Sequence, residues 1–291
     1  MTRILLFMAT NAAILLVITG LFRVLGLESM LYQSGVDLNL TGLLIMSAVI
    51  GMTGSIISLF MSKTMAKHGM GVHVINQPTN PTERWLIDVV ARQAQKAGIG
   101  MPEVGIFNTP EPNAFATGAS KNNALVAVSA GLLQRMNQDE IEAVIGHEIS
   151  HVANGDMVTL TLIQGVVNTF VYFLASIIGY VVDRAVFRSE NGRGMGYFIT
   201  QMVAQIVLSF LATMIVMWFS RWREFHADKG GARLAGRQKM INALRALQGS
   251  SAETIPAEFQ AFAINGGGLS RLFSSHPPIE ERIRALQNLR D

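Results

Sequence analysis

Two histidines four residues apart, with a glutamate between them, are the residues best suited to do chemistry in this chain. They are His147 and His151 with Glu148, in the run His-Glu-Ile-Ser-His. On a helix, four positions make slightly more than one turn, so both imidazoles leave the same face and can bind one zinc ion, while Glu148 lies beside them. The pattern is typical of zinc-dependent hydrolysis in which the glutamate accepts a proton.

The flanks of this run predict the helix that the chemistry requires. Asn137 followed three residues later by Glu140 has the spacing of a capping box, and Asn154-Gly155 provides a stop signal. Apolar residues recur between these ends at helical spacing. The alternative is a pair of core histidines on an amphipathic helix. It would leave both rings and the carboxylate of Glu148 in need of buried partners, so a metal site is the favoured interpretation.

A third metal ligand is expected, because a catalytic zinc usually has three protein ligands and one open position. Glu224 and Asp228 are four residues apart in a second charged segment and share a helix face. We predict that Glu224 binds the same single zinc ion as the two histidines, and that Asp228 accepts a hydrogen bond from a ligand imidazole. The alternative for this segment is a solvated helix start with mixed charges.

The composition indicates a membrane protein. Of the 291 residues, 50% are hydrophobic and only 15% are charged, and the mean hydropathy is +0.35. The apolar excess lies in four segments without Lys, Arg, Asp or Glu, each long enough to cross about 30 Å of hydrocarbon. These predicted transmembrane helices are 4–22, 38–61, 157–182 and 197–219. No small-residue cleavage site follows the first, so we interpret it as an uncleaved helix and not as a signal peptide.

The third predicted span is polar in its first half. The polar residues there are Thr159, Thr161, Gln164 and Asn168. We interpret these side chains as contacts between membrane helices, with a transport path as the alternative.

Lysines and arginines flank the predicted spans unequally. More of them lie on the side that holds 62–156 and 220–291, which predicts that these two segments and both termini are cytoplasmic. Two spans separate His151 from Glu224, so the chain returns to the side that it left and the ligands can meet. The net charge of +3 arises at the span ends, and no basic stripe with interleaved aromatic residues indicates a nucleic acid partner. The chain has no cysteine, which excludes disulfides and a thiol nucleophile.

The polar segments predict an α+β domain in two parts, inserted among about four transmembrane helices. Its first part, 62–156, carries the two histidines, and its second part, 220–291, carries the third ligand. Expected strands are 103–107 and 124–129, and expected helices are 83–97, 237–247 and 279–289. A short extended segment between the two strands contains Asn113, Ala114, Phe115 and Ala116. It is either an edge strand that pairs with a substrate backbone or an ordinary core-facing strand.

The remaining histidines differ in what they can do. His276 precedes two prolines in a loop; it is either a surface residue or one that reaches the site, where it would donate to an oxyanion or contact the zinc in a resting state. His226 lies about 200° around the helix from Glu224 and should face away from the metal. His68 and His73 are expected on the surface.

The run from Ala143 to Asp156, with Glu224 to Asp228 after two hydrophobic segments, resembles the HtpX membrane metalloproteases, which are relatives of the prenyl-protein (CAAX) peptidases. The similarity extends over most of the chain, including Pro112 to Gly118 and Ser275 to Pro278. It implies a zincin-like protease domain in which His147, His151 and Glu224 bind zinc. It also implies that Glu148 is the catalytic acid and base.

The resemblance implies a bacterial inner-membrane protein that takes part in quality control under stress. We therefore expect a zinc metalloendopeptidase that hydrolyses misfolded or damaged membrane proteins by means of a zinc-activated water, with Glu148 as general base. Its expected partners are polypeptide substrates and the lipid bilayer. The alternative is a membrane metal carrier or a catalytically silent scaffold. A carrier should place its ligands within the spans, and a scaffold gives Glu148 no purpose.

Overall fold

The computed structural model describes residues 38–189, 194–248 and 274–289, together with isolated positions before residue 38. Apart from Gly20, the predicted span 4–22 lies outside the described residues. The chain divides into two compact units. The first unit consists of Met1–Ile57 and Thr161–Ile215, and the second unit consists of Ser58–Leu160 and Val216–Asp291.

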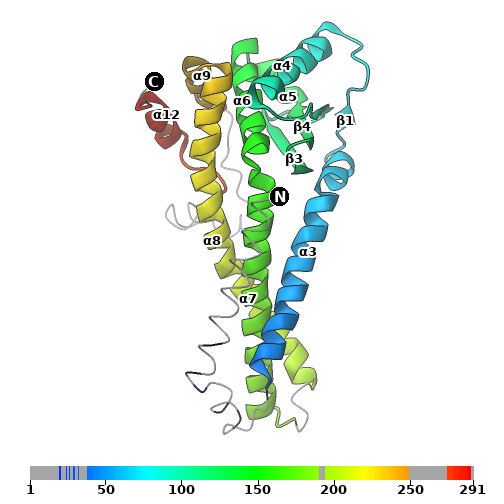
Figure 1. The fold of residues 1–291 in the computed structure, drawn as a ribbon, viewed down its shortest axis with the longest axis vertical. Coiled ribbons are helices and arrows are strands. Elements are labelled where there is room, and N and C mark those ends of the chain that lie inside the picture. The colour runs from blue at the N-terminus through cyan, green and yellow to red at the C-terminus, as the bar shows by residue number, and fades with distance from the viewer. Residues whose placement is uncertain are drawn as a thin grey trace. The chain divides into compact units, whose positions relative to one another are not determined.

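Within the described residues, three helices are long and apolar enough to cross a membrane, by length and composition alone (Figure 1). They are α3 (Leu40–Gly69), α7 (Asp156–Ala185) and α8 (Met195–Ala235). Helices α7 and α8 contain the predicted segments 157–182 and 197–219, and α3 contains nearly all of 38–61. Helix α8 continues beyond its apolar part without a break, so Glu224 and Asp228 belong to the same helix.

Close helix packing with paired polar groups holds α3 against α7 in the first unit. A Cβ atom at Gly51 would lie 2.6 Å from the backbone nitrogen of Thr169, so only glycine permits this approach. Beside it, Asn168 Nδ2 donates to Ser55 Oγ at 3.3 Å, and Gln164 Nε2 donates to Asn168 Oδ1 at 2.8 Å. Asn168 thus bonds between helices, which is the kind of contact that the polar first half of this segment predicts.

A four-stranded sheet, in the order β1-β2-β4-β3, forms part of the second unit. Strands β2 and β4 are parallel, and the other two pairs are antiparallel. The strands are β1 (His73–Val74), β2 (Glu103–Phe107), β3 (Ala114–Ser120) and β4 (Asn123–Ser129). The predicted strands 103–107 and 124–129 are confirmed as β2 and β4, and the segment after Asn113 forms β3 at one end of the sheet.

Five further helices are described in the residues of the second unit that the structure places. They are α4 (Pro81–Ala97), α5 (Ala130–Arg135), α6 (Gln138–Asn154), α9 (Arg237–Gln248) and α12 (Ile279–Gln287). Their apolar faces meet the sheet in one core, where Leu86, Val126, Ile145 and Leu244 are at most 1% exposed. The mixed α and β content of the prediction is confirmed.

The ends of α6 are set by the local signals that the sequence contains. Asn137 and Glu140 form a capping box, in which each side chain accepts a hydrogen bond from the backbone nitrogen of the other residue. At the other end, Gly155 has a φ of 67°, a left-handed conformation that glycine adopts without strain. Because α7 begins directly afterwards, Asp156 is held one residue beyond this turn.

Candidate metal centre

His147 and His151 on α6 meet Glu224 on α8. One potential ligand atom from each of the three residues lies within 4.8 Å of the other two. The Nε2 atoms of the two histidines are 3.1 Å apart, and Glu224 Oε1 is 3.1 Å from His151 Nε2. Glu224 Oε2 is 3.5 Å from His147 Nε2. Both imidazoles therefore direct the same ring nitrogen toward the glutamate.

Each imidazole is oriented by a buried carboxylate at its other nitrogen. Asp228 Oδ1 lies 2.9 Å from His147 Nδ1, and Asp156 Oδ2 lies 2.7 Å from His151 Nδ1. With the proton on Nδ1 and donated to the carboxylate, each Nε2 presents a free lone pair. Asp228 occupies the place that the sequence predicts, whereas Asp156 was not predicted as a partner of His151.

Two arginines neutralise these carboxylates, and neither was predicted for the site. Arg282 on α12 donates to Asp228 through Nε at 2.7 Å and Nη2 at 2.6 Å, and its Nη1 lies 3.3 Å from Glu224 Oε2. Arg223 donates to Asp156. One guanidinium therefore bridges two carboxylates that lie four residues apart on α8.

Glycines allow α6 and α8 to approach closely enough for these contacts. A Cβ atom at Gly231 would lie 3.0 Å from the backbone nitrogen of His147, and one at Gly146 would lie 3.3 Å from Gly231 Cα. A side chain at Gly230 would overlap Ser150. Two adjacent glycines inside a helix, Gly230 and Gly231, are a sequence signal for the close approach of α6 and α8. This approach was not predicted from them.

The surroundings shift the pKa values of the two acidic residues on α8. Burial alone would raise the pKa of Glu224, but His276, Arg282 and His147 outweigh it and hold this pKa well below its usual range. For Asp228, Arg282 and His147 likewise outweigh burial and lower the pKa to about 2. Both residues are thus ionised acceptors at neutral pH.

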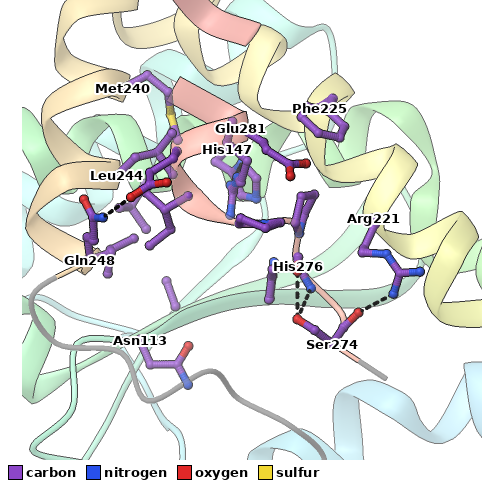
Figure 2. Close-up of a pocket in the computed structure, with 18 of the residues that line it drawn as sticks. Asn113, His147, Arg221, Phe225, Met240, Leu244, Gln248, Ser274, His276 and Glu281 are labelled. Atoms are coloured by element: carbon purple, nitrogen blue, oxygen red, sulfur yellow. Dashed lines mark hydrogen bonds between the residues drawn. The ribbon is translucent and has the colours of Figure 1, made fainter. Parts of the chain in front are cut away.

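Glu148 differs from the other acidic residues of the centre. It is half-buried, and burial raises its pKa although the nearby histidines oppose the effect. Its side chain lines a cavity of about 1140 Å³ together with His147. In Figure 2, Met240 and Leu244 lie on one side of this cavity and Phe225 on the other, with His147 between them.

His276 reaches the centre from the segment that precedes α12. Its Nδ1 lies 2.6 Å from Glu224 Oε2, although the side chain is 51% exposed. Ser274, two residues earlier, accepts a hydrogen bond through its carbonyl from Arg221 Nη1 at 2.8 Å, which ties this segment to α8 (Figure 2). The structure thus brings His276 to the metal ligands.

The other histidines lie away from the centre, as predicted. His226 is exposed, and its Nδ1 lies 3.1 Å from the carbonyl of Trp222 on its own helix. His68 and His73 are also exposed.

The extended segment reaches the cavity only at its start. Asn113 and Ala114 line the cavity, whereas Phe115 packs against Phe107 with the ring centroids 5.5 Å apart. Within the described sheet, β3 pairs only with β4. The carbonyl of Asn113 accepts from the backbone nitrogen of Ser129. By the alternation of antiparallel pairing, Ala114 and Ala116 direct their backbone groups toward the other side of β3.

The residues of the centre fit a divalent cation. Two imidazoles and a carboxylate are the ligand types that zinc takes in hydrolytic sites, and both imidazoles present Nε2. With the imidazoles neutral, Glu224 and Asp228 outnumber the single positive charge of Arg282 by one, and Glu148 adds a second excess negative charge when it is ionised, so a dication fits the cluster. Asp156 is paired separately with Arg223.

Comparisons with known proteins agree with this chemistry. Residues 80–290 match Peptidase family M48. The chain is 62% identical to Protease HtpX of Thioalkalivibrio sulfidiphilus and 60% identical to Protease HtpX of Pseudoalteromonas atlantica, each over 99% of both chains. It is 56% identical to the Protease HtpX homolog of Bordetella pertussis, over 100% of this chain and 99% of that one.

The fold is also found in a solved structure. The crystal structure of S. mikatae Ste24p is similar with a TM-score of 0.63 at 18% identity, over 92% of this chain and 66% of the Ste24p chain. This similarity concerns the fold alone. Since the family match and the HtpX relatives extend over most of the sequence, the chain belongs to peptidase family M48 and is a membrane-bound metalloprotease.

Proposed function

We propose that the protein is a zinc endopeptidase that hydrolyses peptide bonds of misfolded or damaged membrane proteins. The observation that carries this proposal is the convergence of His147, His151 and Glu224 within 4.8 Å, beside a cavity lined by Glu148. The ligand types favour zinc over a harder dication such as magnesium, which prefers oxygen ligands.

The residues of the centre divide the work of peptide hydrolysis among them. Zinc held by the three ligands would polarise the scissile carbonyl and make a water molecule more acidic. Glu148 takes the proton from the attacking water and returns it to the leaving amine, and its raised pKa suits both transfers. Asp228 and Asp156 keep the two imidazoles in the tautomer that binds metal. His276 either donates to the oxyanion or contacts the zinc in a resting state.

The start of β3 is our candidate for the place where the substrate backbone binds. Asn113 and Ala114 line the cavity that contains Glu148, and Ala114 and Ala116 direct backbone groups away from β4. A substrate strand paired there would be held through main-chain hydrogen bonds, which tolerate many side chains. Such tolerance suits an enzyme that removes diverse damaged proteins.

The cellular setting is proposed from the sequence. The bias of Lys and Arg supports a bacterial inner-membrane protein with four spans, in which both parts of the protease domain and both termini are cytoplasmic. The resemblance to HtpX proteins supports a role in stress-linked quality control, with polypeptides and the bilayer as partners. Nothing in the charge distribution favours nucleic acid.

Substitution of the base and of a ligand tests the proposed function. In the full-length protein, Glu148→Gln should keep one zinc per chain and lower the cleavage rate of an unfolded membrane protein by about 10²–10⁴-fold. His147→Ala should lose both zinc and cleavage. His226→Ala, which changes an exposed histidine on α8, is the matched control and should retain both.

The same experiment separates a protease from a metal carrier or scaffold. Zinc content would be measured by atomic emission and cleavage by the appearance of fragments with and without a chelator. Full cleavage by Glu148→Gln would refute the assignment of the base. A zinc-loaded native protein that cuts nothing would favour the scaffold.

A further inference from the structure

We infer that an aromatic face of α8, formed by Trp218, Trp222 and Phe225, binds apolar side chains of the substrate beside the scissile bond. The substrates would then be polypeptides that carry an apolar stretch next to the cleavage site, such as a membrane segment that has left the bilayer. This inference rests on the proposed function, because it assigns the occupant of the cavity that contains Glu148.

The three aromatic side chains form one continuous face. They are spaced four and three residues apart on an unbroken helix, so they lie above one another on one side of α8. All three line the same cavity as His147 and Glu148. Phe219 lies between them in sequence but points about 100° around the helix from Trp218, and it does not line this cavity.

This face is exposed although it is strongly apolar. Trp218 is 65% exposed and Trp222 is 49% exposed. Phe219 and His226 contact Trp222 within their own helix, with ring centroids 5.7 Å and 4.4 Å from that of the indole. An apolar surface of this kind, continuous with a catalytic cavity, is where a ligand side chain gains most from being buried.

The position of the face relative to the metal ligand fits a substrate side chain near the reacting bond. Phe225 directly follows Glu224 and lies about 100° around the helix from it, whereas Trp218 and Trp222 lie about 120° and about 160° from it. A peptide bound at the centre would therefore place the residue next to its scissile bond against Phe225, and residues further along against Trp218 and Trp222.

The opposite wall of the cavity is apolar as well. Met240 and Leu244 of α9 line it with Val144 and Leu132, and each of these four is at most 6% exposed. The charged part of the lining is mixed, with exposed acidic side chains at Glu111, Glu280 and Glu281 and a half-buried basic one at Arg221. An apolar segment is the occupant that matches the apolar surface of both walls.

The competing interpretation is that the two tryptophans only anchor α8 at a lipid interface, where tryptophan is enriched. The two interpretations differ in what they predict for substrate choice. A lipid anchor affects every substrate equally, whereas a binding face distinguishes substrates by their flanking residues.

Two peptides with one scissile sequence provide the test. One would carry a Leu- and Phe-rich flank and the other a Ser- and Gln-rich flank, both assayed with the full-length protein in detergent. We expect Trp218→Ala and Phe225→Ala to raise KM for the apolar-flank peptide by about tenfold with kcat little changed, because they remove uniform binding. The polar-flank peptide should change less than about twofold. Leu211→Ala, which shortens an exposed apolar side chain of α8 outside the cavity lining, is the matched control and should behave as the native protein.

A binding measurement keeps this inference separate from the proposed function. Titration of the zinc-loaded Glu148→Gln protein with the apolar-flank peptide should quench tryptophan fluorescence, and Trp218→Phe should retain most of the affinity. Trp218→Ala in the same background should bind about tenfold more weakly. Equal loss for both peptides, or no loss for either, would overturn the inference. Absence of cleavage by the native protein would instead count against the proposed function.

Discussion

The metal centre of the second unit and the Ser55 cluster of the first unit, formed by Ser55, Gln164 and Asn168, are both groups of polar side chains between packed helices. The Ser55 cluster consists of neutral groups that hydrogen-bond in sequence, so each satisfies its neighbour. In the metal centre the groups are charged, and the ligand nitrogens of both histidines lie within 3.1 Å of each other. Neutral pairs of this kind hold helices together, whereas converging lone pairs require a cation.

The two groups differ in whether their polar atoms are fully paired within the protein. Helix–helix hydrogen bonds are complete in themselves and contribute modestly to stability. Around His147 the carboxylates need Arg282 together with either a metal or protons on the histidines, since removal of these cations leaves a buried charge without a partner. The comparison therefore predicts large, metal-linked effects in the second unit and small, purely structural effects in the first.

The largest effect is expected for Arg282→Met. It leaves Glu224 and Asp228 buried with one cation fewer, which should cost about 3–5 kcal/mol of stability and weaken zinc affinity by about 10–100-fold. Zinc competition titrations and thermal unfolding in detergent measure the two effects. Arg282→Lys should restore part of both. Arg284→Met, an exposed position on the same helix, is the control, and equal damage there would refute the role given to Arg282.

Next in size is the pH dependence of zinc binding. Burial alone would lower the pKa of His147 and His151, but the carboxylates of the centre outweigh it and raise both above 6.5. In the metal-free protein the protonated histidines stabilise the fold fully below pH 6.5, and this contribution is lost as the pH rises through the raised pKa values. Zinc must displace these protons, so its affinity should fall about tenfold for each proton with every unit by which the pH drops below the raised pKa values.

Isothermal titration at several pH values in buffers of different ionisation enthalpy measures the number of protons released. The gap in Tm between zinc-loaded and chelated protein should widen as the pH rises from 6 to 8. A gap that is independent of pH would contradict the raised pKa values. The Ser55 cluster has no ionisable group, so its contribution should not vary over this range.

A matched pair of glycine substitutions compares the two helix crossings. Gly231→Ala should cost about 1–3 kcal/mol and lower zinc occupancy, because its Cβ would press on the backbone of His147. Gly51→Ala should cost a similar amount in the first unit without loss of zinc. Gly54→Ala, where a Cβ meets nothing within 4 Å, should be neutral or slightly stabilising. Unfolding midpoints and zinc content distinguish these outcomes, and zinc loss in Gly51→Ala would break the comparison.

The smallest effect is expected for Asn168→Leu. It removes the hydrogen bond to Ser55 and the one accepted from Gln164, each worth about 0.6 kcal/mol between membrane helices. Thermal unfolding should shift slightly, and peptide cleavage should not change. A loss of cleavage with zinc retained would contradict the purely structural role given to Asn168.

The sequence was sufficient to predict those features that depend on interactions between residues close together in the chain. The ends of α6 could be predicted because Asn137, Glu140 and Gly155 act on backbone groups within one turn. The two histidines follow from helical periodicity. Glu224 required a further argument from topology, because it is distant in sequence from His147.

Partners chosen by tertiary packing could not be predicted. Arg282 lies on the same buried stripe as Ile283 and Leu286, and an isolated arginine on such a stripe can equally well extend to solvent. Its carboxylate partner Asp228 is 54 positions away. Asp156 had a weak local signal, since it directly follows the Gly155 turn, but only the fold shows that the turn brings it back to His151.

The separation of Arg282 from His147 by 135 positions has a consequence for biosynthesis. A ribosome that adds about 5–20 residues per second needs roughly 7–27 s to reach the arginine after it has made the histidine. During this interval the nascent chain lacks the guanidinium that neutralises Glu224 and Asp228, so the hydrolytic centre matures late. We therefore expect the nascent chain to bind zinc weakly until Arg282 has been made.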